Sequence, residues 1–116
     1  IFARNLHQMQ YMTDRDWQTY NELFKNMTQF LQKPDLIIYL RASTDTLLSR
    51  IKNRDRDFER DIAPEYLHSL NISYDRWIKN CSDHKVMTIE SDGFNIFNDN
   101  AQLHEILTQI ENLLNQ

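Results

Sequence analysis

Apolar residues recur every three or four positions along five stretches of the chain, a period typical of amphipathic helices. Thr13 is a good N-cap for the longest of them, because Asp14 and Asp16 follow it in the first turn. Lys33-Pro34 ends that helix, since the residue before a proline is disfavoured in the α conformation. The predicted helices comprise residues 1–12, about 18 residues from Thr13, the stretch from Ser43 into the arginines near 54, about 64–81 and about 100–115.

Two short apolar runs have the composition of strands instead. Leu36–Leu40 is continuous and rich in β-branched and aromatic residues, which predicts a strand buried on both faces and therefore parallel to its neighbours. Lys85–Glu90 predicts a second short strand. Because helical segments separate the two strands, we expect a right-handed crossover onto a parallel sheet. The predicted fold class is therefore α/β, with helices flanking a parallel sheet and making up most of the chain.

The glycine content limits which phosphate-binding loops the chain can contain. Gly93 is the one glycine in 116 residues, whereas a P-loop or a dinucleotide-binding fingerprint needs at least two. A two-stranded sheet is also too small to be stable alone, and the sequence begins with Ile1. We therefore expect residues 1–116 to be a single partial domain, with its other strands and its main phosphate loop upstream of Ile1.

Charge and composition argue against several classes of partner. The net charge of −4 is unsuited to non-specific nucleic-acid binding, which needs a basic surface. No apolar run approaches the roughly 20 residues of a membrane span, and residues 1–10 lack the apolar core of a signal peptide. Cys81, the one cysteine, excludes an internal disulfide and fits a reducing cytoplasm. Cys81 and His84 alone make no metal-ligand set, so no metal site is predicted within the chain.

Arg50, Arg54 and Arg56 are the strongest candidates for chemistry. Arg50 and Arg54 are four residues apart and share one helix face, and Arg56 follows at the start of a charged loop. Three converging guanidinium groups can stabilise charge on transferring phosphoryl oxygens, because arginine stays charged and donates bidentate hydrogen bonds. The alternative is a solvated helix end whose arginines favour the helix dipole and pair with neighbouring aspartates. The spacing alone favours this second explanation.

Aromatic residues at helical spacing are most simply explained as core. Trp17, Tyr20 and Phe24 recur on one face of the long helix, and Phe2 lies on the first. We therefore predict that Trp17, Tyr20 and Phe24 are packed inside the domain, although the long helix could also serve in a dimer. For Phe2, the position alone would favour the same explanation.

Four segments of the chain stand out in combination. They are IFARNL (residues 1–6), PDLIIYLRAS (34–43), the arginine segment R-I through R-x-R-x-x-E (50–59) and YL (66–67). Together they resemble the C-terminal half of the deoxynucleoside kinases, most closely the bacterial deoxyadenosine/deoxyguanosine kinase branch. The resemblance covers nearly the whole chain, and its combination of strand, arginine segment and Tyr-Leu helix is fairly specific.

The resemblance implies a fold and an activity. The fold would be the C-terminal part of a P-loop kinase-type parallel sheet flanked by helices. The activity would be transfer of the γ-phosphoryl group of ATP to the 5′-hydroxyl of a deoxynucleoside, in the cytoplasm, by a homodimer. Mg²⁺ would be needed, with its ligands upstream of Ile1. Residues 1–116 alone would be inactive, because the loop that holds the β- and γ-phosphates is absent.

The resemblance also assigns roles to individual residues. The lid over the ATP phosphates would comprise about residues 50–62, with Arg50, Arg54 and Arg56 binding phosphate and the last two acting in catalysis. Glu59 would bind the sugar 3′-hydroxyl, and Phe2 would stack on the nucleoside base. The loop Ser91–Phe97 would lie along the adenine of ATP, with contacts from Asp92, Gly93 and Phe94.

Two other functions fit the sequence. A thymidylate-kinase-like nucleoside monophosphate kinase shares the PDLxxYL strand and the arginine lid, and would need room for an acceptor phosphate. A non-catalytic helical interaction module would use the arginines only to solvate a helix end. An upstream G-x-x-x-x-G-K-[ST] motif would distinguish the kinases from the interaction module.

Overall fold

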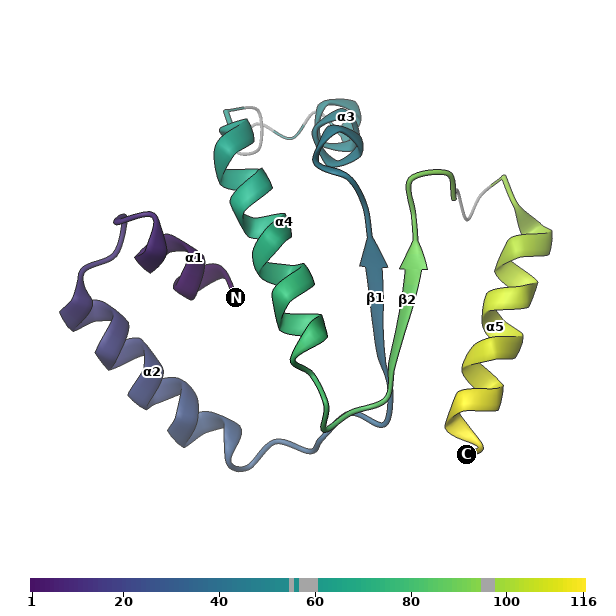
Figure 1. Cartoon of the computed structure of the whole chain (residues 1–116), viewed down its shortest axis with the longest axis horizontal. Coiled ribbons are helices and arrows are strands. Elements are labelled where there is room, and N and C mark those ends of the chain that lie inside the picture. Colours follow the sequence, from purple (N-terminus) through teal and green to yellow (C-terminus); the bar gives the residue numbers. More distant parts are fainter. Residues whose placement is uncertain (55, 57–60, 95–97) are drawn as a thin grey trace.

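The computed structural model of the chain describes residues 1–116 except 55, 57–60 and 95–97. Within this described part, helices and strands follow one another in the order that the hydrophobic pattern predicts (Figure 1). The elements are α1 (Phe2–Gln8), α2 (Asp14–Thr28), β1 (Ile37–Arg41), α3 (Thr44–Arg54), α4 (Pro64–Lys79), β2 (Val86–Glu90) and α5 (Asn100–Leu114).

The two strands form a parallel pair, as predicted. Ile37 lies opposite Val86 and Arg41 opposite Glu90, so the strands are in register along their whole length. α3 and α4 connect them, which makes the crossover that a parallel pair requires. Figure 1 shows that both strands point towards α3, so their carboxyl ends lie at the same end of the sheet.

The prediction that the first strand is buried on both faces is wrong for the described structure. Ile38 is 42% exposed and Leu40 is 62% exposed. Tyr39 hydrogen-bonds to Asp75 of α4, so its neighbours Ile38 and Leu40 lie on the opposite face of the strand, away from that helix. A continuous apolar run predicts what a strand can bury, but its burial here depends on which elements surround it.

Local hydrogen bonds explain why two helices are shorter than predicted. α1 ends in a Schellman motif: Gln10 adopts a left-handed conformation with φ 65°, and the N–H of Tyr11 bonds to the carbonyl of Leu6 at 2.9 Å. α2 begins at the predicted N-cap, Thr13, but ends at Thr28, three residues before Leu31. The Thr28 hydroxyl donates to the Phe24 carbonyl at 2.8 Å, a local bond that competes with helix continuation.

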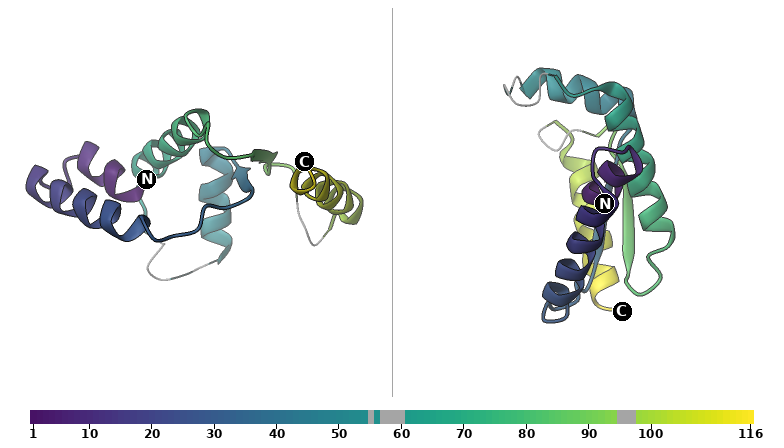
Figure 2. Two further views of the ribbon diagram at one scale, coloured as in Figure 1. Left: turned by 90° about the horizontal axis from the view of Figure 1, so that it is seen from below. Right: turned by 90° about the vertical axis from the view of Figure 1, so that its left-hand side faces the viewer.

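The aromatic residues of α2 are not core, which corrects a second prediction. α2 has no buried residue; Tyr20 is 42% exposed and Phe24 is 53% exposed. Figures 1 and 2 show α1 and α2 at one end of the molecule and α5 at the other, so α2 contacts little besides α1. The buried apolar residues lie in α1, in α4 and around the strands: Ala3, Ala42, Leu67, Leu70, Met87 and Ile89.

A buried asparagine fixes α1 on α4. The Asn5 side chain is fully buried. Its Oδ1 accepts hydrogen bonds from Ser69 at 2.6 Å and from Ser73 at 3.5 Å, both on α4. Because a buried amide oxygen without partners would be costly, these bonds specify how the two helices pack.

Candidate functional site

The candidate site lies where the two parallel strands end. The chain leaves β1 at Arg41 and enters α3, and it leaves β2 at Glu90 and enters the loop that begins at Ser91. In open parallel sheets, ligands bind beyond the carboxyl ends of the strands. Figure 1 places α3 and the start of this loop together at that end.

Ser91 is a buried polar residue at the centre of this arrangement, with only 6% of its surface exposed. Its N–H and its hydroxyl both donate to the carbonyl of Arg41, at 2.7 and 2.8 Å. Arg50 of α3 donates through Nη1 to Ser91 Oγ at 3.2 Å and through Nη2 to the Ser91 carbonyl. Ser91 therefore connects β1, the loop after β2 and α3.

Asp92 makes a second connection to α3, at the start of the helix. Its Oδ1 accepts a hydrogen bond from the N–H of Ser43 at 2.8 Å. This bond, more than any other contact, lowers the pKa of the Asp92 carboxyl below its usual value, and hydroxyls of Thr46 and Ser43 act in the same direction. Ser43 itself caps α3, since its Oγ accepts from the N–H of Thr46 at 3.2 Å.

The other predicted loop residues border open space. Gly93 is exposed, and a Cβ at this position would meet no atom within 4 Å. Phe94 is half-buried, and its N–H bonds to the Ser91 carbonyl at 3.3 Å, which turns the chain back on itself. The space beside the Gly93 backbone and the Phe94 ring is compatible with a planar ligand. The remaining predicted loop residues, 95–97, lie outside the described part.

The predicted lid residues differ in their contacts and in their exposure. Arg50 is engaged with Ser91, Arg54 is the last residue of α3, and Arg56 is exposed just beyond it. α3 has no buried residue, so its arginines are carried on a surface helix. Glu59 lies outside the described residues. The structure therefore brings Arg50 and Asp92 to one place, through Ser91 and Ser43.

The deciding observation comes from comparison with known families. The profile of the family described as Deoxynucleoside kinase matches residues 1–115. The chain belongs to the deoxynucleoside kinase family. This confirms the resemblance found in the sequence, together with the predicted fold class.

Individual relatives of the deoxynucleoside kinase chain agree with this assignment. It is 42% identical over 82 residues to the deoxyadenosine kinase of Dictyostelium discoideum, an alignment covering 71% of this chain and 34% of that protein. It is 36% identical to a probable deoxycytidine kinase of fowlpox virus, over the whole chain and 51% of the viral protein. The structure of deoxyadenosine kinase from M. mycoides with bound dCTP superposes with a TM-score of 0.81 at 27% identity, covering 93% of this chain and 58% of that one. The kinase chain thus spans about a third to three fifths of these relatives.

Phe2 of the kinase chain lies apart from the arginines. It is 53% exposed and meets Tyr74 of α4 edge to face, with ring centroids 5.9 Å apart. Figures 1 and 2 place α1 and α3 on different sides of α4. Phe2 is therefore not a core residue, because half of its surface faces outwards.

Sequence reasoning missed a polar network on the strands of the kinase chain. Tyr39 donates through its hydroxyl to Asp75 of α4 at 2.7 Å. Arg41 forms ion pairs with Asp75 at 3.3 Å and with Glu90 at 3.2 Å. Asp75, and after it Glu90, raise the pKa of the Arg41 guanidinium, while burial and then the Asp75 bond raise the pKa of Tyr39. This network ties β1 to α4 and β2 just below the candidate site.

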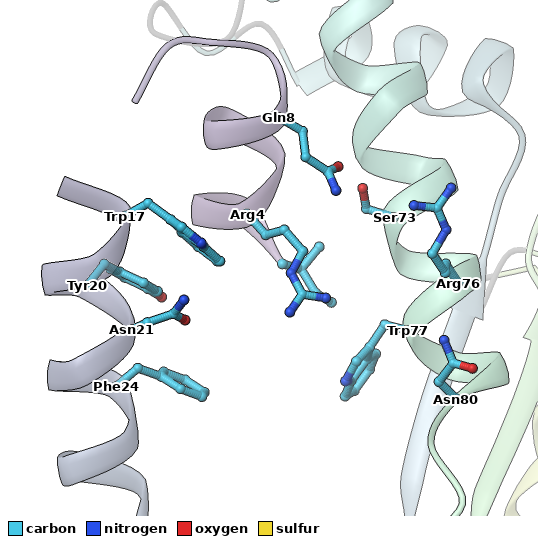
Figure 3. A pocket seen from close by; sticks show the side chains of 11 residues that line it. Arg4, Gln8, Trp17, Tyr20, Asn21, Phe24, Ser73, Arg76, Trp77 and Asn80 are labelled. Carbon is cyan, nitrogen blue, oxygen red and sulfur yellow. The ribbon is translucent and has the colours of Figure 1, made fainter. Parts of the chain in front are cut away.

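A second cleft, of about 330 Å³, lies between α1, α2 and α4. Figure 3 shows Arg4 and Arg76 with aromatic side chains from α2 and α4 around it. The Arg4 guanidinium lies 6.0 Å from the Trp17 ring centroid, and Trp17, Tyr20 and Phe24 follow one another as near-parallel rings along α2. The helical spacing of these aromatics was the available signal, but it is equally compatible with a core position.

The described residues offer no cluster of three or more metal-ligating His, Cys, Asp or Glu side chains. No helix in the described part is long and apolar enough to cross a membrane.

Proposed function

We propose that this chain supplies the lid and the adenine-side loop of an ATP-dependent deoxynucleoside kinase. The enzyme would transfer the γ-phosphoryl group of ATP to the 5′-hydroxyl of a deoxynucleoside. The proposal rests chiefly on the position of the arginine-bearing α3 beside the loop that begins at Ser91, at the carboxyl ends of two parallel strands. Family membership over residues 1–115 supports the same activity.

The arginines would act on the phosphates. Arg54 ends α3 and Arg56 follows it on the surface, so both guanidinium groups can turn towards a nucleotide held beyond the strands. In phosphoryl transfer, charge spreads over three oxygens in the transition state, and positioned arginines stabilise that charge. Arg50 lies at the same site, one turn earlier in α3, where it donates to Ser91.

The adenine of ATP would lie along the loop. Asp92 is held by Ser43, Gly93 leaves open space beside the backbone, and Phe94 offers part of a ring. These features suit a flat, neutral base better than a phosphate, because the nearest side-chain charge on the loop is the Asp92 carboxylate. The phosphates would then extend towards α3.

The deoxynucleoside would be bound at a different place. Phe2 is held by Tyr74 and half-exposed, so its free surface can stack on a base. Glu59 would accept a hydrogen bond from the sugar 3′-hydroxyl when the lid closes. The P-loop, the general base and the Mg²⁺ ligands would be supplied upstream of Ile1.

A homodimer in the cytoplasm completes the proposal. Leu23 and Met27 lie one turn apart on α2 and are 58% and 63% exposed, and Phe30, two residues beyond the end of the helix, is 87% exposed. Exposed apolar stripes of this kind mark interaction surfaces. A second copy of the chain would bury this stripe against its own α2.

The test is a transfer assay with the full-length enzyme. We expect ATP-dependent conversion of deoxyadenosine, deoxyguanosine or deoxycytidine to the 5′-monophosphate, followed by chromatography of the products. Lys52→Ala is the matched control, because Lys52 is an exposed cation on α3 without a role in the proposal. Phosphorylation of thymidine monophosphate but of no deoxynucleoside would favour the monophosphate-kinase alternative. No transfer to any acceptor would favour the interaction module.

A further inference from the structure

α3 is attached to the rest of the domain by apolar and by polar contacts. None of its residues is fully buried, and Leu47, Leu48 and Ile51 lie half-buried on one side of the helix. Polar contacts supplement this apolar packing. Thr44 meets His68 of α4 at 3.1 Å, and Ser43 and Arg50 bond to the loop after β2.

The contacts with that loop occur at two levels of the helix. Asp92 accepts from Ser43 at the N-cap, and Arg50 donates to Ser91 seven residues later, which is about two helical turns. The loop end is itself fixed, because both donors of Ser91 bond to the Arg41 carbonyl at the end of β1. Two separated attachments to a fixed point determine the direction of a helix as well as its position.

The geometry points to Arg50 as a positioning residue. We propose that the Arg50–Ser91 and Ser43–Asp92 bonds form a latch. This latch fixes α3, the helix that carries the lid arginines, to the loop that begins at Ser91 and would lie along the adenine. Arg54, one turn beyond Arg50, is thereby held in a constant relation to the bound adenine. The statement that the bound nucleotide is ATP rests on the proposed function. The latch itself is inferred from the hydrogen bonds alone.

The latch competes with the simpler idea that Arg50 binds phosphate directly. Both terminal nitrogens of Arg50 already donate to Ser91, so direct phosphate binding requires these bonds to break. The two roles predict different effects at Ser91. Ser91→Ala removes the Oγ acceptor of the latch, keeps the carbonyl acceptor and leaves the charge at residue 50 unchanged. Only the latch therefore makes this variant weaken ATP binding in the same way as an Arg50 variant.

The kinetic test uses the full-length enzyme and five variants. We expect Ser91→Ala and Arg50→Lys each to raise the KM for ATP about tenfold, the usual worth of a hydrogen bond to a charged group. The KM for the deoxynucleoside should change less than about twofold, and the double variant should be no worse than the worse single one, since both act on one contact. Ser91→Thr keeps the hydroxyl and should restore most of the ATP affinity, and Lys52→Ala should behave as wild type. A normal KM for ATP in Ser91→Ala, alongside a raised one in Arg50→Lys, overturns the latch in favour of direct phosphate binding.

Amide hydrogen exchange of the nucleotide-free full-length enzyme separates the latch from the proposed function. We expect residues 44–54 to exchange about tenfold faster in Ser91→Ala and in Asp92→Ala, with exchange in α5 unchanged. Unchanged protection of α3 in both variants overturns the latch. If the wild-type enzyme transfers no phosphate, the proposed function fails, and this exchange result alone decides whether the latch exists.

Discussion

α2 and α3 are both helices without a buried residue, yet they are exposed in opposite ways. α2 presents large apolar side chains to solvent, among them Leu23 and Met27. α3 presents charged ones and is held by hydrogen bonds to Ser91 and Asp92. The difference separates two meanings of exposure: a surface that another protein surface can bury, and a surface that has to remain accessible to a ligand.

The comparison is physical, because the two kinds of surface respond to different forces. Apolar side chains in water favour burial by roughly 25 cal/mol per Å². A hydrogen bond at a surface contributes a net stability of only about 0.5–1.5 kcal/mol, because its donor and acceptor can bond to water instead. A helix attached in part by such bonds can open and close, as lids must. A helix with an apolar stripe is expected to stay with its partner.

The largest expected effect concerns the arginines at the end of α3. In the full-length enzyme, Arg54→Ala and Arg56→Ala should each lower kcat by about 100–1000-fold, because each removes a donor to charge that develops in the transition state. The KM for the deoxynucleoside should change much less. Steady-state kinetics with Lys52→Ala as the control checks this. If both variants kept more than about half of the wild-type kcat, the arginines would be ordinary surface charge.

The second largest expected effect concerns the exposed apolar side chains of α2 and the proposed dimer. Leu23→Glu should raise the dimer dissociation constant at least about 100-fold, because an unpaired charge in a buried interface costs about 3 kcal/mol or more. Analytical ultracentrifugation at micromolar concentration measures the change. Gln18→Glu adds the same charge on the opposite side of α2 and should leave the dimer intact. A wild-type monomer, or a Leu23→Glu variant that remains dimeric, would contradict the proposed interface.

A substitution of Glu59, which follows α3 in the sequence, should have a smaller effect that is selective for substrates with a 3′-hydroxyl. Glu59→Gln or Glu59→Ala should lower kcat/KM for a 2′-deoxynucleoside about tenfold, the worth of a hydrogen bond to a carboxylate. A 2′,3′-dideoxynucleoside lacks the 3′-hydroxyl and should be affected little. The measurement is the ratio of kcat/KM for the two substrates in wild type and variant. An unchanged ratio would assign Glu59 to surface pairing with neighbouring arginines.

Periodicity was sufficient to predict most of the fold. It located the seven described elements, because each has a dominant apolar period and recognisable ends, such as Thr13 before α2 and Pro64 at the start of α4. It failed where burial depends on elements distant in sequence. Tyr20 and Phe24 were expected in the core, but no described helix covers them. Hydrophobic pattern indicates which side chains prefer burial, and only the assembled surroundings determine whether they achieve it.

The site was predictable in its residues more than in its contacts. Arg50 and Asp92 were singled out separately, one by the arginine spacing and one by the family resemblance. Their connection runs through Ser91 and Ser43, which no spacing in the sequence relates. Likewise Asp75 meets Tyr39 and Arg41 only because α4 packs across β1. Such pairs depend on tertiary distance, which local pattern does not contain.

The smallest expected effect concerns this Tyr39–Asp75 pair, which joins β1, the strand between α2 and α3 in the sequence, to α4. Tyr39→Phe removes one hydrogen bond while Asp75 keeps its ion pair with Arg41, so no charge is left without a partner. The free energy of unfolding should therefore fall by only about 0.5–1.5 kcal/mol. Urea unfolding of the full-length enzyme measures it, with Tyr11→Phe as the control, because Tyr11 is 73% exposed.

The pH dependence sharpens this last prediction. Burial, and then Asp75, raise the pKa of Tyr39 in the folded state above its unfolded value of about 10. A raised folded pKa contributes stability that is fully present below pH 10 and is lost as the pH rises towards the folded pKa. Wild type should therefore lose stability above pH 10 more steeply than Tyr39→Phe, so that the difference between the two proteins shrinks. A difference that stays constant from pH 8 to 11 would mean that the Tyr39 hydroxyl is no more protected from ionisation than a tyrosine in water. In that case β1 would be held to α4 by the Arg41–Asp75 ion pair and by stacking of Tyr39 on Tyr74, whose ring centroids are 6.3 Å apart.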